Sequence, residues 1–298
     1  MGRWTSAELE TGMSDSKELR SLSITALDIR EATLRMIFDA QSGHPGGSLS
    51  CVDILTALYG KVLRHNPKDP TWEDRDYFIL SKGHAAPALY AALSHYGYFD
   101  KVLLTTLRKY GSPLQGHPER GSVPGVEVST GALGMGLAIS VGIALGIKLD
   151  EKPNRVHVLL GDGECQEGAV WEAAMAAAHY HLDNLVAIVD RNGLQIDGPT
   201  EKIMSLEPFG AKWESFGWHI IEINGSNLNE VLRAFQTATH LQGKPTVIIA
   251  YLVKGAGVPF MEHVQKFHGT VPTAQEYHQA LALLKEAKQK LVNGEDLK

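Results

Sequence analysis

The chain has 298 residues and a hydrophobic content of 44%, so it is long enough for one or two domains with a large buried core. Its 28 basic and 34 acidic residues give a net charge of −6 without a dense Lys/Arg stripe, which argues against a nucleic-acid partner. The two cysteines, Cys51 and Cys165, lack CxxC spacing, which excludes a disulfide framework and fits a reducing cytosol.

We expect no targeting signal in the amino-terminal region. Arg3 and several acidic residues precede any apolar run, unlike a secretory or organellar signal, so we expect a cytoplasmic protein. We expect residues 1–14 to be flexible. Asp15 and Glu18 have the spacing of a capping box, and apolar residues at near-helical spacing predict that a long first helix follows them.

The stretch 42–47 breaks this first helix, and apolar spacing predicts another helix over 52–62. Short apolar runs then predict strands at 77–80, 156–160, 185–189, 218–223 and 246–252. Helical patterns separate most of these runs, which is typical of a doubly wound α/β fold with a mainly parallel sheet and helices on both faces. Thr273 and Glu276 form a second capping box that opens a terminal amphipathic helix. We predict a single domain over residues 1–298.

Residues 129–147 form an uncharged run of 19 residues, near the lower limit for a membrane span. Five glycines interrupt the run, and soluble α/β patterns flank it, so we predict a buried helix and no membrane partner. Gly142 and Gly146, four residues apart, mark a face of small residues that suits either a close-packed subunit interface or internal packing.

Two polar motifs each follow a predicted strand. The Gly-Asp-Gly at 161–163 ends one strand, and Asn192 lies just past the next, with an alanine-rich helix between them. Such a βαβ unit has parallel strands, and its right-handed crossover brings both loops to one edge of the sheet. Mg²⁺ prefers oxygen ligands from one or two protein groups together with phosphate oxygens and water. Asp162, Asn192 and a nearby backbone carbonyl therefore predict a magnesium diphosphate site.

Each motif also has an ordinary interpretation, because Gly-Asp-Gly and Asn-Gly are both common in turns. Their joint position at two strand ends of one unit favours the ligand site. Other phosphate motifs are missing, since no GxxxxGK[ST] occurs and the glycines at 131, 134 and 136 do not have the order of a dinucleotide fingerprint. Cys165 lies in the same loop, and we interpret it as a small filler residue rather than a reactive thiol.

Four histidines, His44, His84, His117 and His268, lie in glycine-containing loops. Imidazoles can bond sugar hydroxyls and phosphate oxygens near neutral pH, so several converging around a diphosphate would suit a polyhydroxylated substrate. A zinc site is the competing interpretation, but no HxxxH or HExxH spacing links the four. The other histidines are interpreted as structural or superficial, except His263, which stays undecided.

Seven motifs in a fixed order carry a family resemblance. They are SGHPGG at 42–47, LSKGHA at 80–85, GHPE at 116–119, STGALGMGL at 129–137, GDGECQEG at 161–168, DRNGLQIDG at 190–198 and FHG at 267–269. Together they resemble the amino-terminal domain of transketolase, from about Leu19 to Glu276. The QEG at 166–168 and the SGHPG loop favour this family over 1-deoxy-xylulose-5-phosphate synthase.

The resemblance implies a cofactor, thiamine diphosphate, and a metal ion, Mg²⁺, with Ca²⁺ or Mn²⁺ as substitutes. By position, the implied metal ligands are Asp162, Asn192 and the Leu194 carbonyl. The implied contacts to the cofactor phosphates are Gly163, His84 and His268, and Gly131 and Leu133 match backbone sites near the aminopyrimidine.

The resemblance also implies catalytic groups. His84 is one of them, in addition to its implied contact with the phosphates. His117 would hold the terminal hydroxyl of the ketose donor, and His44 and His268 would assist proton movement at the carbon–carbon bond. Glu167 and Glu172 match carboxylates of an acidic network between active sites. The implied reaction transfers a two-carbon ketol unit from a ketose phosphate to an aldose phosphate, with the cofactor as electron sink.

Full-length transketolases continue into a pyrimidine-binding domain, whose glutamate activates the cofactor, and into a third domain. Neither occurs within these 298 residues. The resemblance therefore implies the amino-terminal half of a split transketolase. We expect this chain to be inactive alone and to form an α₂β₂ assembly with a carboxy-terminal subunit.

Three alternatives stay open at this point. The chain could belong to a split ketol transferase for an unusual sugar phosphate, or be a cofactor-binding module without turnover. His44 and His117 argue against the module, because bare cofactor binding needs neither. It could also be a fragment of a longer enzyme, although the capped, Lys-rich terminal helix resembles a natural end.

Overall fold

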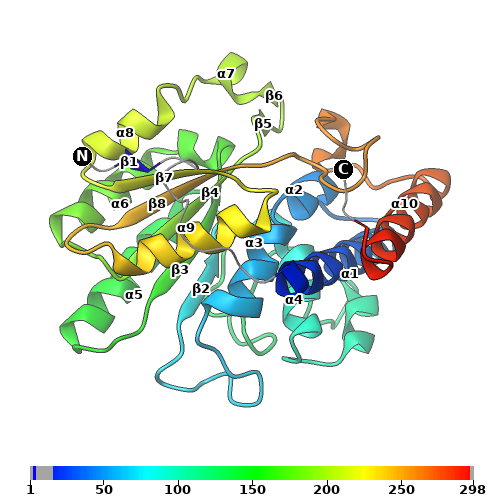
Figure 1. Ribbon diagram of the computed structural model, residues 1–298, viewed down its shortest axis with the longest axis horizontal. Helices are drawn as coiled ribbons and strands as arrows, with labels where there is room; N and C mark the ends of the chain where they lie inside the picture. Colours follow the sequence, from blue (N-terminus) through cyan, green and yellow to red (C-terminus); the bar gives the residue numbers. More distant parts are fainter. Residues whose placement is uncertain (1–2, 5–15, 296–298) are drawn as a thin grey trace.

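A six-stranded parallel sheet forms the centre of the molecule (Figure 1). The computed structural model describes residues 3–4 and 16–295. The sheet has the order β1-β7-β8-β4-β3-β2, and each neighbouring pair is parallel. Its strands are β1 (Arg3–Trp4), β2 (Tyr77–Leu80), β3 (Val156–Gly161), β4 (Leu185–Arg191), β7 (His219–Asn224) and β8 (Thr246–Tyr251). A separate two-stranded hairpin joins β5 (Leu194–Gln195) and β6 (Gly198–Pro199).

The central strands are apolar because both faces of the sheet are covered. Every residue of β4 is buried, as expected for a strand in the middle of a parallel sheet. The predicted doubly wound fold is confirmed, and all five predicted strands lie within two residues of their predicted bounds. Trp218 was predicted to open a strand, but β7 begins one residue later.

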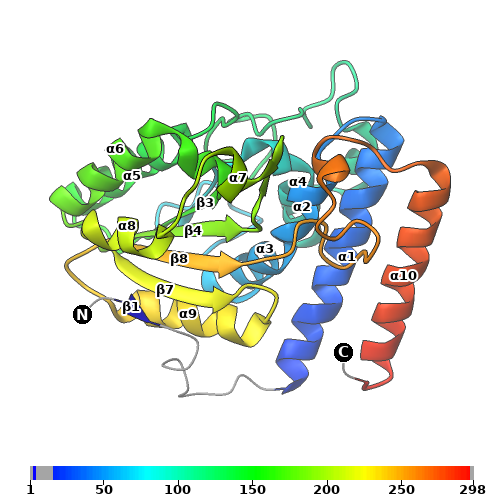
Figure 2. The same cartoon turned by 90° about the horizontal axis from the view of Figure 1, so that it is seen from above.

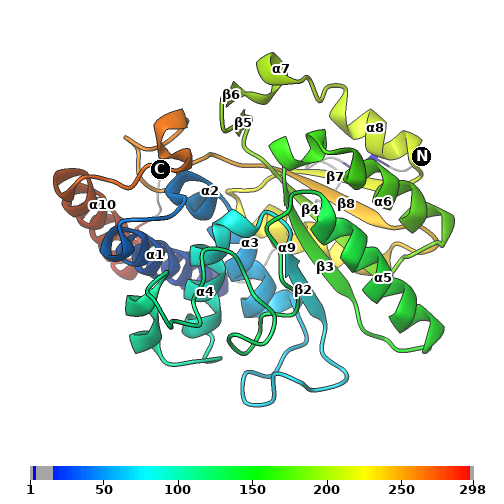
Figure 3. The same cartoon turned by 180° about the vertical axis from the view of Figure 1, so that it is seen from behind.

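Helices cover the two faces of the sheet in separate layers (Figures 1 and 3). On one face lie α5 (Met135–Leu149), α6 (Gly168–His179) and α8 (Phe209–Ser215). On the other lie α1 (Ser16–Ala40), α3 (Val52–Ala57), α4 (Ala86–His95) and α9 (Leu228–His240). Alternate strand residues point into the two layers: Leu159 packs in the second layer, whereas Val158 and Leu160 pack in the first.

The last helix, α10 (Ala274–Val292), packs antiparallel against α1 at the edge of the molecule (Figure 2). Tyr277 near its start stacks on Phe38 near the end of α1, with ring centroids 4.0 Å apart. The predicted capping box of Thr273 and Glu276 is confirmed. The remaining elements are α2 (Pro45–Ser50), α7 (Thr200–Ile203), a π-helical turn at Leu58–Val62, and 3₁₀ turns at Gly83–Ala85, Lys101–Thr106, Gly163–Gln166 and Gln265–His268.

Helix α5 is not buried on all sides, which corrects part of the prediction for residues 129–147. One face packs into the core, but Gly142 and Gly146 are exposed, and a Cβ atom built at either would meet nothing within 4 Å. The alternative that these two glycines serve internal packing is therefore wrong. None of the helices in residues 16–295 combines the length and the apolar character that a membrane crossing needs.

Of the segment 1–14 that was predicted to be flexible, Arg3 and Trp4 pair with Ile220 and Ile221 as the edge strand β1. The rest of that segment lies outside the described residues, as does Asp15, the first residue of the predicted capping box.

Candidate functional site

Loops that follow β2, β3, β4 and β8 meet at the carboxyl edge of the sheet, where open α/β folds bind ligands. The amino-terminal end of α2 closes the same region. Together they line a cavity of about 410 Å³. Apart from Glu172, the residues that the sequence pointed to as site residues all line the cavity: His44, His84, His117, Gly131, Leu133, Asp162, Gly163, Glu167, Asn192, Leu194 and His268.

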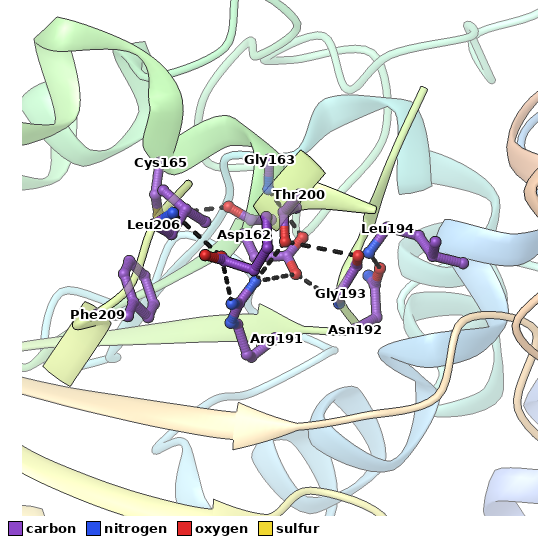
Figure 4. Close-up of polar contacts among 12 residues, drawn as sticks. Asp162, Gly163, Cys165, Arg191, Asn192, Gly193, Leu194, Thr200, Leu206 and Phe209 are labelled. Carbon is purple, nitrogen blue, oxygen red and sulfur yellow. Dashed lines mark hydrogen bonds and ion pairs between the residues drawn. The ribbon is translucent and has the colours of Figure 1, made fainter. Parts of the chain in front are cut away.

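Asp162 and Asn192 come together because β3 and β4 are adjacent and in register, with Gly161 opposite Asp190. Asp162 is 1% exposed, and its carboxylate accepts backbone N–H groups from Gly163 (2.8 Å) and Gly193 (2.6 Å) (Figure 4). Burial, with a smaller contribution from the nearby carboxylate of Asp190, raises the pKa of Asp162. A buried carboxylate with a raised pKa gains most from a cation beside it.

The amide of Asn192 is oriented by its neighbours. Its Nδ2 donates to Asp190 at 3.0 Å, and its Oδ1 accepts the N–H of Leu194 at 3.1 Å. The amide oxygen of Asn192 is therefore on the side of the cavity that Leu194 lines, and it keeps a second lone pair for a ligand. Asp190 is in turn fixed by a buried ion pair with Lys82.

Lys254 is a cavity residue that the sequence analysis did not single out. Its ammonium donates to the carbonyl oxygen of Leu194 at 3.1 Å and lies 2.8 Å from Nδ1 of His268. Burial and the positive charge of Lys82 lower the pKa of Lys254 to about 8, so it remains mostly charged at pH 7. A buried ammonium in the cavity suits an anionic ligand.

Three of the four loop histidines form a triangle of rings. The centroids of His44 and His84 are 5.2 Å apart, those of His44 and His268 are 5.5 Å apart, and those of His84 and His268 are 5.4 Å apart. Burial lowers the pKa of His44 and of His268 to about 4, and it holds that of His84 well below its usual value. All three rings are therefore neutral at pH 7.

The fourth loop histidine, His117, packs beside the loop that carries Gly131. A Cβ atom at Gly131 would lie 3.3 Å from the ring of His117, and the backbone there has a φ of +153°. Burial and the charge of Arg108 lower the pKa of His117. Glu167 also faces the cavity but is exposed, as is Glu172 on α6.

A second residue that the sequence analysis missed is Glu164, which is 3% exposed. Its carboxylate accepts a hydrogen bond from the hydroxyl of Ser81 and from the backbone N–H groups of Gly134 (2.8 Å) and Gly161 (3.0 Å). Glu164 thereby joins the loops after β2 and β3 to the glycine loop before α5. It fixes the walls of the cavity relative to one another.

Two residues with open or contested roles lie away from the cavity. Cys165 is buried, its thiol donates to the carbonyl of Gly161, and burial raises its pKa well above the usual value, which leaves the thiol unreactive. His263 is exposed, has a φ of +59° and donates its backbone N–H to Lys254. It does not line the cavity.

The residues present fit a metal diphosphate. Residues 16–295 contain no group of three or more His, Cys, Asp or Glu side chains arranged to hold a metal alone, so a cation at Asp162 would need ligand oxygens from elsewhere. Mg²⁺ takes such oxygens from phosphates. Gly163 lines the same cavity beside Asp162, and a Cβ atom there would lie 2.7 Å from Cβ of Gln195, so the position does not accommodate a side chain. Nδ1 of His44 is buried without a partner among the described residues.

Comparison with known proteins gives consistent matches. The profile of the family described as "Transketolase, thiamine diphosphate binding domain" matches residues 23–286. An apulose-4-phosphate transketolase subunit of Phocaeicola vulgatus is 43% identical over 274 residues, which cover 92% of this chain and 97% of the relative. A 6-deoxy-6-sulfo-D-fructose transketolase subunit of a Clostridium species is 43% identical over 258 residues, which cover 87% of this chain and 94% of the relative.

The solved structure of transketolase from Campylobacter jejuni superposes with a TM-score of 0.81 at 31% identity. The match covers 94% of this chain and 48% of that chain, so the chain spans about half the length of this solved relative. The resemblance predicted from the seven motifs is thereby confirmed.

Proposed function

The chain belongs to the transketolase family, as its thiamine diphosphate-binding domain, and from this premise we propose that it is the amino-terminal subunit of a split transketolase. It transfers a two-carbon ketol unit between sugar phosphates together with a second polypeptide. One observation carries the proposal: a single cavity at the carboxyl edge is lined by all of the residues that match the family's cofactor and substrate positions.

In this proposal the cofactor diphosphate and Mg²⁺ share the cavity. Asp162, Asn192 and the Leu194 carbonyl hold the metal, with Ca²⁺ or Mn²⁺ as substitutes. Lys254 contributes a positive charge to the phosphates, and Gly163, which lines the same cavity, contacts them. When bound, thiamine diphosphate supplies the electron sink for breaking the carbon–carbon bond.

The neutral histidines supply proton transfer and substrate contacts. His44 and His268 assist proton movement at the substrate hydroxyl: both rings are neutral at pH 7, and His268, whose Nδ1 faces Lys254, takes part through the hydrogen on Nε2. His84 contacts the phosphates, and His117 holds the donor's terminal hydroxyl. Glu167 belongs to a carboxylate network that continues into the neighbouring polypeptide.

An exposed apolar face supports a partner subunit. Met135 and Leu149 on α5 are 47% and 75% exposed, and Met175 on α6 is 59% exposed. Gly142 and Gly146 lie on the same exposed side of α5 without a neighbour, so another chain could approach the helix backbone closely. We propose that a second copy of this chain and a carboxy-terminal partner assemble here as α₂β₂. Two relatives of similar length carry the word "subunit" in their names.

The sugar specificity has two candidates. The first is ordinary transketolase chemistry on ketose and aldose phosphates. The second is ketol transfer from an unusual sugar, which is favoured by the names of the two relatives that are 43% identical, one for apulose-4-phosphate and one for 6-deoxy-6-sulfo-D-fructose. A panel of donors that includes both of these sugars separates the candidates. We also propose a cytoplasmic location, which two free, buried cysteines favour.

The deciding experiment reconstitutes the chain with the polypeptide encoded beside its gene and measures ketol transfer and cofactor affinity. We expect activity only in the mixture. Asp162→Asn should abolish metal-dependent cofactor binding, whereas Asp197→Asn, an exposed position at the same cavity, should leave it unchanged. Full activity of the chain alone would contradict the subunit proposal, and unchanged affinity in Asp162→Asn would contradict the metal site.

A further inference from the structure

Arg191, the last residue of β4, is a junction between the Asp162 loop and the segment that follows β4. Its Nη1 donates to Oδ2 of Asp162 at 3.2 Å and to the hydroxyl of Thr200 at 2.7 Å. Its Nη2 donates to Glu201 at 2.9 Å and to Glu207 at 3.0 Å. The side chain is 8% exposed, and Figure 4 shows it beside Asp162 and Thr200.

The carboxylate of Asp162 is oriented mainly from the β4 side. Its Oδ2 receives both Arg191 and the N–H of Gly193, while Oδ1 receives the N–H of Gly163, the residue next to it. A carboxylate has about four lone-pair sites. Because Arg191 and Gly193 take two of them on Oδ2 and Gly163 takes one on Oδ1, the rotation of the carboxylate is set, and one lone pair remains on Oδ1 for a cation.

The same guanidinium shapes the segment 193–207, which carries part of the cavity wall. The carboxylate of Glu201 accepts hydrogen bonds from the N–H groups of Leu206 (3.1 Å) and Glu207 (3.3 Å). The same carboxylate accepts a hydrogen bond from Arg191, so the guanidinium is connected to this turn. Gln195, at the other end of the segment, lines the cavity and lies against Gly163.

We propose that Arg191 is a positioning residue that couples the fold of the segment 193–207 to the orientation of Asp162, so that metal affinity and the order of this segment change together. The inference rests on the metal site proposed at Asp162. The coupling requires a planar group that bonds Asp162 and the segment 193–207 at the same time. A guanidinium can do this, whereas the ammonium of lysine is only a point charge.

The test compares Arg191→Gln and Arg191→Lys with a matched control, Arg64→Gln, in the full chain. Arg64 pairs with Asp76 at 2.9 Å, and Asp76 directly precedes β2 at the amino edge of the sheet. Replacing Arg64 therefore removes an Arg–Asp ion pair at the edge opposite the cavity. Mn²⁺ in the presence of thiamine diphosphate is the probe, and electron paramagnetic resonance gives its affinity. Hydrogen exchange of the amides in 193–206, without metal, reports on the segment.

We expect Arg191→Gln to weaken Mn²⁺ binding about 10- to 100-fold, which is typical for the loss of a partner that orients a metal ligand. The amides of 193–206 should exchange faster in the same variant. Arg191→Lys should restore part of both properties, and Arg64→Gln should change neither. Glu207→Gln, at a half-exposed position, should give a smaller change in the same direction and guards against a general folding defect.

Unchanged Mn²⁺ affinity in Arg191→Gln overturns the inference. So does lowered affinity with unchanged exchange, because Arg191 would then act on Asp162 without coupling it to the segment. If Asp162→Asn itself leaves Mn²⁺ affinity unchanged, the proposed metal site fails and the coupling fails with it. If the amides of 193–206 still exchange faster in metal-free Arg191→Gln, Arg191 would then stabilise the segment without acting on a metal site.

Discussion

The ammonium of Lys254 lies 2.8 Å from Nδ1 of His268. A charged ammonium has only hydrogens to offer, so Nδ1 of His268 must accept, and the neutral ring then carries its hydrogen on Nε2. Burial followed by the charge of Lys254 lowers the pKa of His268 to about 4. The lysine therefore fixes both the tautomer and the charge state of the histidine.

Replacing Lys254 by methionine should weaken thiamine diphosphate binding about 10- to 100-fold, the range expected for losing a hydrogen bond to a charged group. The pKa of His268 should rise, because the positive charge beside its ring is removed. Calorimetry on the reconstituted complex and ¹⁵N NMR of the imidazoles measure the two effects. Lys254→Arg keeps the charge and should lose less affinity. Equal affinity in the methionine variant would contradict a role toward the phosphates.

Gly163→Ala should damage the cavity through a steric clash. A Cβ atom there would lie 2.7 Å from Cβ of Gln195, so the segment after β4 must move. Overpacking of this kind costs about 1–3 kcal/mol in stability, and cofactor affinity should fall as well. Gly168→Ala is the matched control at the start of α6, where a Cβ atom meets nothing within 4 Å. Thermal unfolding and calorimetry decide the outcome, and equal behaviour of the two variants would refute the clash.

His157 should make the chain sensitive to acid. It is 3% exposed on β3, and burial lowers its pKa from 6.5 to about 4, with Asp76 opposing and Arg155 adding to the shift. The unfolded chain binds a proton here that the folded chain does not, so stability falls as pH drops from about 6.5 to about 4. His157→Gln should flatten this slope in urea unfolding, whereas His278→Gln, exposed on α10, should not. A slope that is equally steep in His157→Gln would show that other groups dominate.

Gly142→Arg should block assembly without harming the fold. The position is exposed and has no neighbour within 4 Å, so an arginine fits the isolated chain, but it would stand in the face that we assign to a partner. A charge buried at such a contact should cost at least about 2 kcal/mol of binding, which sedimentation or size exclusion detects. Gln279→Arg on the exposed side of α10 is the control. Normal assembly of Gly142→Arg would move the interface elsewhere.

The sheet was predictable because its strands are short apolar runs with turn residues between them. The edge strand β1 was not, since Arg3 and Trp4 form only two pairs and a pair of residues has no periodicity. The exposure of one side of α5 could also not be predicted from the sequence. Glycine is compatible with burial and with exposure, and the choice at Gly142 depends on which elements pack nearby.

The site was predictable where residues occur in motifs at strand ends, as with Asp162 and Asn192. Lys82 and Lys254 occupy similar positions, after β2 and β8, and that placement could have pointed to them. A single lysine carries no sign of burial in a sequence, however. Arg191 was missed for the same reason, because its contacts to Glu201 and Glu207 depend on how the following segment folds back.

The cavity contains a buried carboxylate, Asp162, and a buried ammonium, Lys254. The carboxylate attracts the metal ion and repels the diphosphate, whereas the ammonium does the opposite. A diphosphate that arrives alone is repelled by the first, and a metal ion that arrives alone is repelled by the second. Each ligand relieves the penalty of the other, and thermodynamic reciprocity requires that each raises the other's affinity by the same factor. We therefore expect the chain to respond to the coincidence of cofactor and metal, and not to an excess of either one.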